Sequence, residues 1–192
     1  MRVLLSGFEV FGSNKENPTE KLINSFLRKE ISYPSSMKIE AVVLPVTYEE
    51  SYRLLKKRID EFNPDIIIGF GLASTRETID IETIAANIMD RRTADNNGKK
   101  PTDIKISPDG PDSFVSTLPV SGLRATLIKN GLPADESTSA GSYVCNYLFY
   151  NLMRDNQDTF RLCGFIHVPP EEKLPFTDLQ KALSVILGYL DY

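Results

Sequence analysis

The first 70 residues alternate between short apolar runs and capped amphipathic segments, and this alternation constrains the fold more than any other feature of the chain. Buried strands are predicted at residues 3–5, 39–44 and 64–69, the last of them containing three consecutive isoleucines, as parallel central strands often do. Two helices are predicted between the strands, one opening at Asn17 with proline at its first position and one over residues 47–62. This β-α-β-α-β order predicts an α/β fold with helices packed on the faces of a sheet.

The remaining residues continue this order, with one polar interruption. Residues 91–117 are polar and rich in turn signals. Because a structureless loop of this length is uncommon, we expect a functional lid or an arm with weak strands of its own. The other expected elements are strands at 79–87, near 134 and at 160–168, and helices at 119–130, at 142–155 and after a cap at Thr177. No repeat or linker is visible, so residues 1–192 are predicted to form a single domain, a three-layer α/β/α sandwich around a twisted, largely parallel mixed sheet.

Composition excludes several classes of function. The 26 acidic and 22 basic residues give a net charge of −4 without a basic stripe, so neither nucleic acid nor an anionic membrane surface is an expected partner. No apolar stretch approaches the roughly 20 residues that span a bilayer, and the amino-terminal apolar run is too short for a signal sequence. One histidine and two distant cysteines form neither a disulfide framework nor a zinc site. These features indicate a cytoplasmic, reduced protein without a metal or other cofactor.

The single histidine, His167, is the only imidazole with which a cysteine could exchange a proton near neutral pH. Cys145 lies near the start of the predicted helix 142–155, which descends about 15 Å over ten residues. The strand that follows climbs roughly 20 Å before it reaches His167. Both residues therefore return to the carboxyl edge of the sheet, where open α/β folds bind their ligands. A helix amino terminus also stabilises a thiolate, and its amides can receive an oxyanion.

Cys163, the second cysteine, does not fit this geometry. It shares a strand face with His167 but lies about 13 Å away along the strand, too far for proton transfer. We therefore expect it to be a packed core thiol. Geometry alone leaves Cys145 open to two other interpretations, a small buried hydrophobe or a redox-sensing thiol, and His167 could be a hydrogen-bonded structural residue.

Five segments resemble those of one enzyme family, and they occur in order from residue 6 to residue 169. They are Ser6-Gly-Phe-Glu-Val-Phe-Gly12 with Asn17-Pro18, Ile79-Asp-Ile-Glu-Thr-Ile-Ala-Ala-Asn-Ile88, the polar middle with Asp95-Asn96 and Pro108-Asp-Gly-Pro111, Ser139-Ala-Gly-Ser-Tyr-Val-Cys-Asn146, and Gly164-Phe-Ile-His-Val-Pro169. In these segments the chain resembles the type I pyroglutamyl peptidases, also called pyrrolidone-carboxylate peptidases. That family has a phosphorylase/hydrolase-like α/β/α fold and consists of cysteine peptidases.

The resemblance implies an exopeptidase that removes an amino-terminal pyroglutamyl residue from peptides through an acyl-enzyme. Carried over by position, Cys145 is the nucleophile, His167 is its general base and acid, and Glu82 is the third member of a triad. Taken without the resemblance, Glu82 is an ordinary exposed strand carboxylate. The resemblance also implies self-association as a dimer or tetramer, with the polar arm near residues 93–117 as one candidate contact.

The resemblance further implies a pocket for the small neutral lactam, which requires apolar walls and a few directed hydrogen bonds. Phe8 and Phe11 match two phenylalanines that line the family's pocket. Asn17 matches a pocket residue but also fits a helix cap, and Arg92 matches an arginine near the active site. Leu72 departs from the pattern, because it stands where the family usually has a glutamine that serves the substrate.

This departure keeps other functions open. One is a catalytically impaired relative that binds peptides or senses redox state through Cys145. A weaker alternative is a nucleoside-phosphorylase-like enzyme on the same broad fold, but no glycine-rich phosphate loop or basic cluster supports it.

Overall fold

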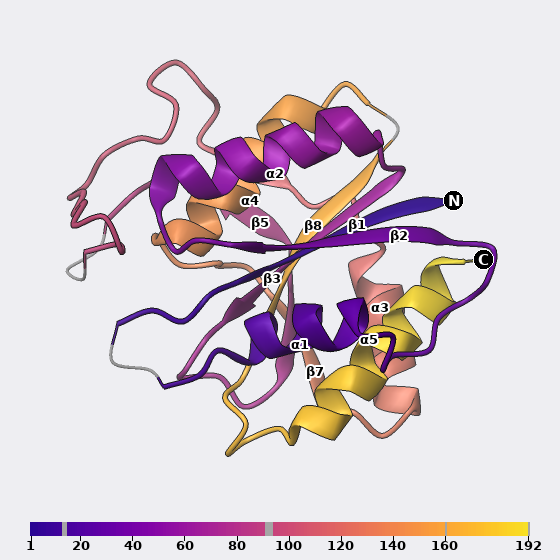
Figure 1. The fold of residues 1–192 in the computed structure, drawn as a ribbon. Coiled ribbons are helices and arrows are strands. Elements are labelled where there is room, and N and C mark those ends of the chain that lie inside the picture. The colour runs from indigo at the N-terminus through magenta and orange to yellow at the C-terminus, as the bar shows by residue number, and fades with distance from the viewer. Residues whose placement is uncertain (13–14, 91–93, 160, 192) are drawn as a thin grey trace.

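A six-stranded sheet forms the centre of the computed structural model, which describes residues 1–12, 15–90, 94–159 and 161–191 (Figure 1). Its strand order is β2-β1-β3-β8-β4-β7, and neighbours are parallel except that β4 runs antiparallel to β8. The strands are β1 (Arg2–Phe8), β2 (Lys38–Leu44), β3 (Ile66–Leu72), β4 (Ile79–Glu82), β7 (Ala134–Ser137) and β8 (Leu162–Val168). The order confirms the largely parallel mixed sheet.

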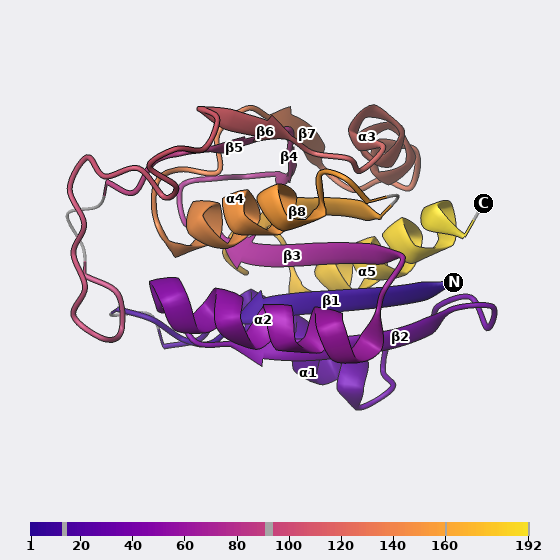
Figure 2. The ribbon, with the colours of Figure 1, turned by 90° about the horizontal axis from the view of Figure 1, so that it is seen from above.

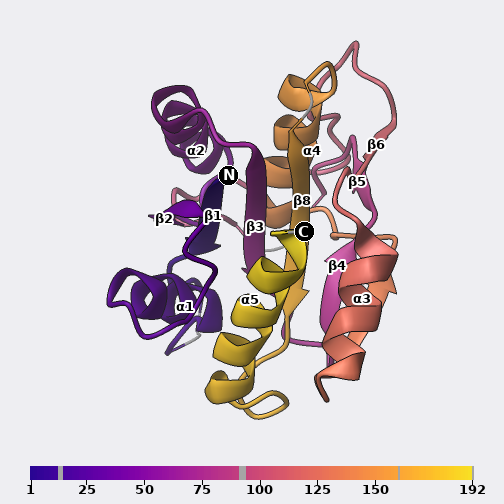
Figure 3. The same cartoon turned by 90° about the vertical axis from the view of Figure 1, so that its right-hand side faces the viewer.

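Helices cover both faces of the sheet and complete three layers (Figure 3). The helices α2 (Tyr48–Phe62) and α4 (Val144–Asn156) lie on one face. The opposite face carries three helices: α1 (Pro18–Leu27), α3 (Val120–Lys129) and α5 (Phe176–Leu190). Each face buries its own apolar cluster, with Ile67 and Phe149 in the first and Ile68 and Leu183 in the second. The predicted α/β/α architecture is thus confirmed.

The polar middle of the chain is an arm that carries a short strand. Residues 79–87 do not form one strand: β4 ends at Glu82, and β5 (Ile84–Ala86) pairs antiparallel with β6 (Ser113–Val115) in a separate two-stranded sheet. Met89 and Ile104 add an isolated bridge. From β5 the arm runs toward the amino end of α2 (Figure 2), where the Asn96 amide donates to the Val46 carbonyl at 2.9 Å.

Two of the three expected helix caps differ from the prediction. Asn17 does cap α1, because its Oδ1 accepts from the Thr19 amide at 3.0 Å. Thr47 makes no side-chain capping bond to α2; Asp95 from the arm accepts the Tyr48 amide at 3.0 Å instead. Thr177 lies inside the first turn of α5, which follows Pro175, so its predicted role as the cap is wrong. Pro175, the residue before α5, has its φ angle fixed by the proline ring at a value that suits entry into the helix.

Among the described residues, every helix is too short or too polar to cross a bilayer.

Candidate active site

The carboxyl ends of β1, β3 and β8 open into one cavity of about 570 Å³. Its opposite wall is the loop that enters α4, residues 139–143. Parallel strands place their carboxyl ends at the same edge, which is where ligand sites of open α/β sheets form. Six of the residues predicted for the site line this cavity: Phe8, Phe11, Asn17, Leu72, Cys145 and His167.

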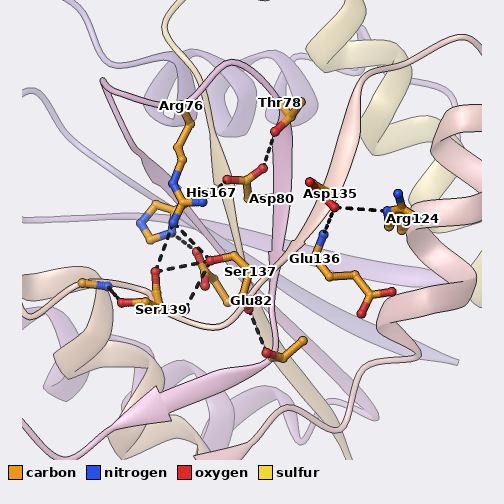
Figure 4. Close-up of polar contacts among 12 residues, drawn as sticks. Arg76, Thr78, Asp80, Glu82, Arg124, Asp135, Glu136, Ser137, Ser139 and His167 are labelled. Carbon is orange, nitrogen blue, oxygen red and sulfur yellow. Dashed lines mark hydrogen bonds and ion pairs between the residues drawn. The ribbon is translucent and has the colours of Figure 1, made fainter.

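The alternation of side chains along β8 and β4 brings an imidazole and a carboxylate together. Phe165 and His167 face α4, whereas Ile166 packs on the other side of the sheet. On β4, Ile79 and Ile81 pack on the α3 and α5 side, so Asp80 and Glu82 face α4. His167 Nδ1 lies 2.7 Å from Glu82 Oε1 (Figure 4).

Glu82 is fully buried, at 0% exposure, which contradicts the exposed carboxylate that its residue type alone would suggest. A buried carboxylate is costly unless it is hydrogen-bonded. The contact with Nδ1 supplies such a partner and leaves the other ring nitrogen, Nε2, for the cavity. The imidazole is therefore held in one orientation.

Cys145 is the second residue of α4, and its sulfur lies against the backbone of β3. A Cβ added at Gly71 would be only 2.8 Å from the Cys145 sulfur. Gly71 is the residue that pairs with His167 in the register of β3 and β8. Glycine at this position therefore lets the thiol approach the strand that carries the imidazole.

The pKa of His167 is raised to about 9 from an ordinary 6.5. Burial acts to lower it, because a low-dielectric site disfavours the imidazolium. The hydrogen bonds and negative charges of Cys145 and Glu82 act in the opposite direction and outweigh burial. Near neutral pH the imidazole thus holds its proton beside the sulfur, the arrangement that favours a thiolate.

The start of α4 is fixed by the residue that follows the cysteine. Asn146 is fully buried, and its side chain accepts from the Ala86 amide at 3.0 Å and donates to the carbonyls of Ala86 and Ile88. These bonds join the first turn of α4 to β5. The amides of a first helical turn have no partner within the helix and point toward the entering chain, so this turn can also receive an oxyanion.

The predicted pocket residues occupy different parts of the cavity wall. Phe8 is buried and packs on Phe165 at a ring distance of 6.5 Å, whereas the partly exposed Phe11 packs on Tyr143 at 6.2 Å. Asn17 lines the cavity while its side-chain oxygen caps α1. Leu72 presents an apolar side chain at the end of β3.

Arg92, predicted near the site, lies outside the described residues.

Cys163 lies in the opposite half of β8 and is fully buried. Burial raises the pKa of this thiol to about 12, so it stays protonated and inert near neutral pH. This agrees with the expected core thiol. Among the described residues no group of three or more His, Cys, Asp or Glu side chains could hold a metal ion.

Sequence reasoning missed two charged residues at this site, Arg76 and Asp80. Arg76 lines the cavity, and its Nη1 lies 2.6 Å from Asp80 Oδ2. The strict alternation of apolar and acidic residues in Ile79-Asp-Ile-Glu82 was a usable signal, because it places Asp80 on the same face as Glu82.

Comparisons with known proteins agree with this geometry. The family model described as pyroglutamyl peptidase matches residues 1–184 of the chain. The chain belongs to the pyroglutamyl peptidase family. It is 42% identical over 170 residues to the pyrrolidone-carboxylate peptidase of Thermococcus litoralis, an alignment that covers 88% of this chain and 76% of the relative. The corresponding protein of Bacillus cereus is 41% identical over 174 residues, covering 88% and 80%.

A solved structure of the family has the same fold as this chain. The crystal structure of pyroglutamyl peptidase I from Bacillus amyloliquefaciens superposes with a TM-score of 0.90 at 31% identity, covering all of this chain and 97% of the other. The family suggested by the five sequence segments is therefore confirmed.

Proposed function

We propose that this protein is a cysteine exopeptidase that hydrolyses the bond after an amino-terminal pyroglutamyl residue. Cys145 serves as the nucleophile, His167 as the general base and acid, and Glu82 as the residue that orients the imidazole. The observation that carries this proposal is the contact chain from the buried Glu82 through the buried His167 to the partly buried Cys145, at one wall of the cavity. Membership of the pyroglutamyl peptidase family supports the choice of substrate.

The reaction proceeds by acyl transfer. His167 takes the proton of the Cys145 thiol, and the sulfur attacks the carbonyl carbon of the pyroglutamyl residue. The tetrahedral oxyanion lies toward the first turn of α4. The C–N bond then breaks, and the imidazolium gives its proton to the leaving amine. Water attacks the thioester with His167 as base, the C–S bond breaks, and free pyroglutamate leaves as the sulfur regains its proton.

Substrate selection in this proposal depends on the shape and polarity of the cavity. Pyroglutamate has no charged amino group, so apolar walls such as Phe8 and Phe11 suit its ring. Leu72 places an aliphatic side chain in the same wall, so the lactam receives fewer side-chain hydrogen bonds than a polar residue at this position would provide. Asn17 contributes mainly through the cap that fixes the first loop, and Arg92 is proposed to adjust the local field.

The remaining proposals concern the whole protein. We propose a single-domain cytoplasmic protein that self-associates as a dimer or tetramer, with the arm that includes β6 as one contact. The net charge of −4 supports the absence of a nucleic-acid partner. Sedimentation velocity at several protein concentrations would establish the assembly state.

Hydrolysis of a pyroglutamyl amide with a chromogenic amine tests the proposed function. We expect wild type to release the amine and Cys145→Ala and His167→Ala to lose at least about a thousandfold in kcat/KM, with far-UV circular dichroism unchanged. Cys163→Ala is the matched control and should keep wild-type activity, because that thiol lies away from the cavity. Inactive wild type would refute the proposal and leave a relative that binds peptides or senses redox state through Cys145. Normal turnover by Cys145→Ala would refute Cys145 as the nucleophile.

A further inference from the structure

An ion pair between the buried Asp80 and the partly exposed Arg76 adjoins the proposed triad. Asp80 is 2% exposed, and both of its oxygens are occupied: Oδ2 lies 2.6 Å from Arg76 Nη1 and Oδ1 accepts from the Thr78 hydroxyl at 2.5 Å (Figure 4). A carboxylate in such a place needs a fixed cation, because its isolated charge would be strongly disfavoured. Arginine keeps its charge at every accessible pH. The pair is thus a permanent feature of the folded protein.

The other arm of the same guanidinium reaches the loop that leads to the nucleophile. Arg76 Nη2 donates to Ser137 Oγ at 3.1 Å and to the Ser139 carbonyl at 3.2 Å. Ser137 ends β7, and Ser139 begins the cavity wall that continues into α4 at Cys145. A planar guanidinium can hold both sides at once in a fixed geometry. Arg76 therefore joins the β4 carboxylate to the segment that enters α4.

Asp80 also lies close to the imidazole-bearing residue in the sheet. Asp80 is the residue directly opposite His167 in the antiparallel ladder of β4 and β8, on the face that carries Glu82. Among the described residues, the titratable or charged groups facing His167 are Glu82 and Asp80 from β4, Cys145 from α4, and Arg76 from the 73–78 loop. Because Arg76 neutralises Asp80, Glu82 is left as the one uncompensated carboxylate beside the imidazole.

We propose that Arg76 is a positioning residue with two tasks: it holds the Ser137–Ser139 segment against β4, so that the wall before Cys145 keeps its place, and it cancels the charge of Asp80 beside His167. This inference rests on the proposed peptidase function for its activity readout. A second readout, the rate at which iodoacetamide alkylates Cys145, needs no substrate. The two proposals can therefore fail separately.

Asp80→Asn isolates the charge. The amide keeps the shape of the carboxylate, and the guanidinium beside His167 is then uncompensated. A positive charge favours the thiolate and disfavours the imidazolium. The rise of the alkylation rate with pH and both limbs of the kcat/KM profile should therefore move to lower pH, on the order of one unit. In Arg76→Met/Asp80→Asn the charge balance is restored, and the limbs should return to their wild-type pH.

Arg76→Lys isolates the hold on the loop. Its single ammonium keeps the charge but cannot bond Asp80 and the Ser137–Ser139 segment together. We expect its pH limits to match wild type while kcat/KM falls about tenfold, as for a small displacement of reacting groups. The double variant should show a similar or larger fall in rate. If kcat/KM of Asp80→Asn falls but its pH profile does not shift, Arg76 does not act by neutralising Asp80.

Arg124→Met is the matched control. Arg124, on α3, makes an exposed ion pair at 3.3 Å with Asp135. Asp135 belongs to β7, the strand that ends at Ser137, but it does not line the cavity. The variant should behave as wild type in rate and pH profile, since an exposed pair contributes little. Three results would each overturn the proposal: an unshifted alkylation profile in Asp80→Asn, a rate within twofold of wild type in Arg76→Met/Asp80→Asn, or an equal loss in Arg124→Met. If wild type fails to hydrolyse the pyroglutamyl amide, the alkylation profiles still decide it.

Discussion

At the scale of single residues, the site depends on how one imidazole is surrounded. His167 is only 5% exposed, with Glu82 at one ring nitrogen and the Cys145 thiol toward the other. Burial alone would leave such a ring neutral. Two acidic neighbours reverse that tendency. In the proposed reaction, the proton needed by the leaving group is therefore already on the imidazole when the thiolate attacks. Changing either neighbour should therefore move the pH range of activity.

Glu82→Gln should lower the pKa of His167, because it removes a charge that stabilises the imidazolium. The basic limb of kcat/KM, expected near pH 9 in wild type, should shift toward neutrality. The same pKa, raised above its ordinary 6.5, contributes stability that is complete below about pH 6.5 and is lost as the pH rises through about 9. Urea unfolding between pH 6 and pH 10 should show this loss at lower pH in Glu82→Gln. Identical profiles in both proteins would contradict the role of Glu82.

Leu72→Gln adds an amide to the cavity wall. If the lactam occupies this wall, a new hydrogen bond of about 1 kcal/mol should lower KM several-fold with little change in kcat. Leu72→Met is the control, because it changes shape slightly without adding a polar group. Steady-state kinetics on the pyroglutamyl amide distinguishes the two. An unchanged or higher KM in Leu72→Gln would place the lactam elsewhere in the cavity.

The predicted proximity of Cys145 and His167 rests on how few such residues the chain contains. With one histidine and two cysteines, chain direction alone selects Cys145 over Cys163, and the structure places Cys145 beside His167. The orientation of Glu82 was not accessible in that way, because the antiparallel pairing of β4 with β8 depends on contacts far apart in sequence. The alternation along residues 79–82 indicates the face that carries Asp80, but its pairing with Arg76 and its place opposite His167 depend on the folded chain.

At the scale of elements, the arm acts as a brace for the helices around the site. Asp95 is 5% exposed; its Oδ1 accepts the amides of Asn97 and Lys99, and its Oδ2 accepts the amide of Tyr48 at the start of α2. The hydroxyl of Tyr143, the residue just before α4, donates to the Ala94 carbonyl at 2.9 Å. The arm therefore ties together the first turn of α2 and the entrance of α4.

Asp95→Ala should reduce the free energy of unfolding by about 2 kcal/mol, because it leaves buried amides without acceptors. Thr47→Val is the paired control. The Thr47 hydroxyl is buried and has no hydrogen-bond partner among the described residues, so the substitution should change stability by at most about 0.5 kcal/mol. Urea unfolding of both variants measures the difference. A larger loss in Thr47→Val than in Asp95→Ala would restore Thr47 as the effective cap.

The local sequence pattern located most helices and strands. It could not show which strands pair or which distant residues cap a helix, as Asp95 does at α2. The six predicted strands near β1, β2, β3, β4, β7 and β8 all exist. The alternation over residues 79–87 predicts one continuous strand, yet Thr83 turns the chain between two sheets. Its amide donates to the Ser137 carbonyl, and its carbonyl accepts from the Ser116 amide. Such a break depends on partners that the run itself does not contain.

At the scale of the whole molecule, the two apolar clusters share one sheet. Neighbouring residues of β3 belong to opposite clusters: Ile67 packs against α2 and α4, and Ile68 packs against α1 and α5. Neither cluster can lose its sheet face without exposing the other. The two sides are therefore expected to unfold together, as a single domain would.

Thiol accessibility can test this cooperativity. In the native protein only Cys145 should react with iodoacetamide near neutral pH, because burial raises the pKa of Cys163 to about 12. Across a urea gradient, modification of Cys163 should follow the same midpoint as circular dichroism. Reaction of Cys163 well before the main transition would indicate that the β8 core opens independently and that residues 1–192 do not act as one unit.

Trapping the acyl-enzyme would be the most direct examination of the central claim. Wild type mixed with a pyroglutamyl amide and quenched in acid within one turnover should carry one pyroglutamyl group, and peptide mapping by mass spectrometry should place it on Cys145. The adduct should be absent in Cys145→Ala and unaffected by Cys163→Ala. Hydrolysis that proceeds with no label on Cys145, or with the label on another side chain, would contradict the account.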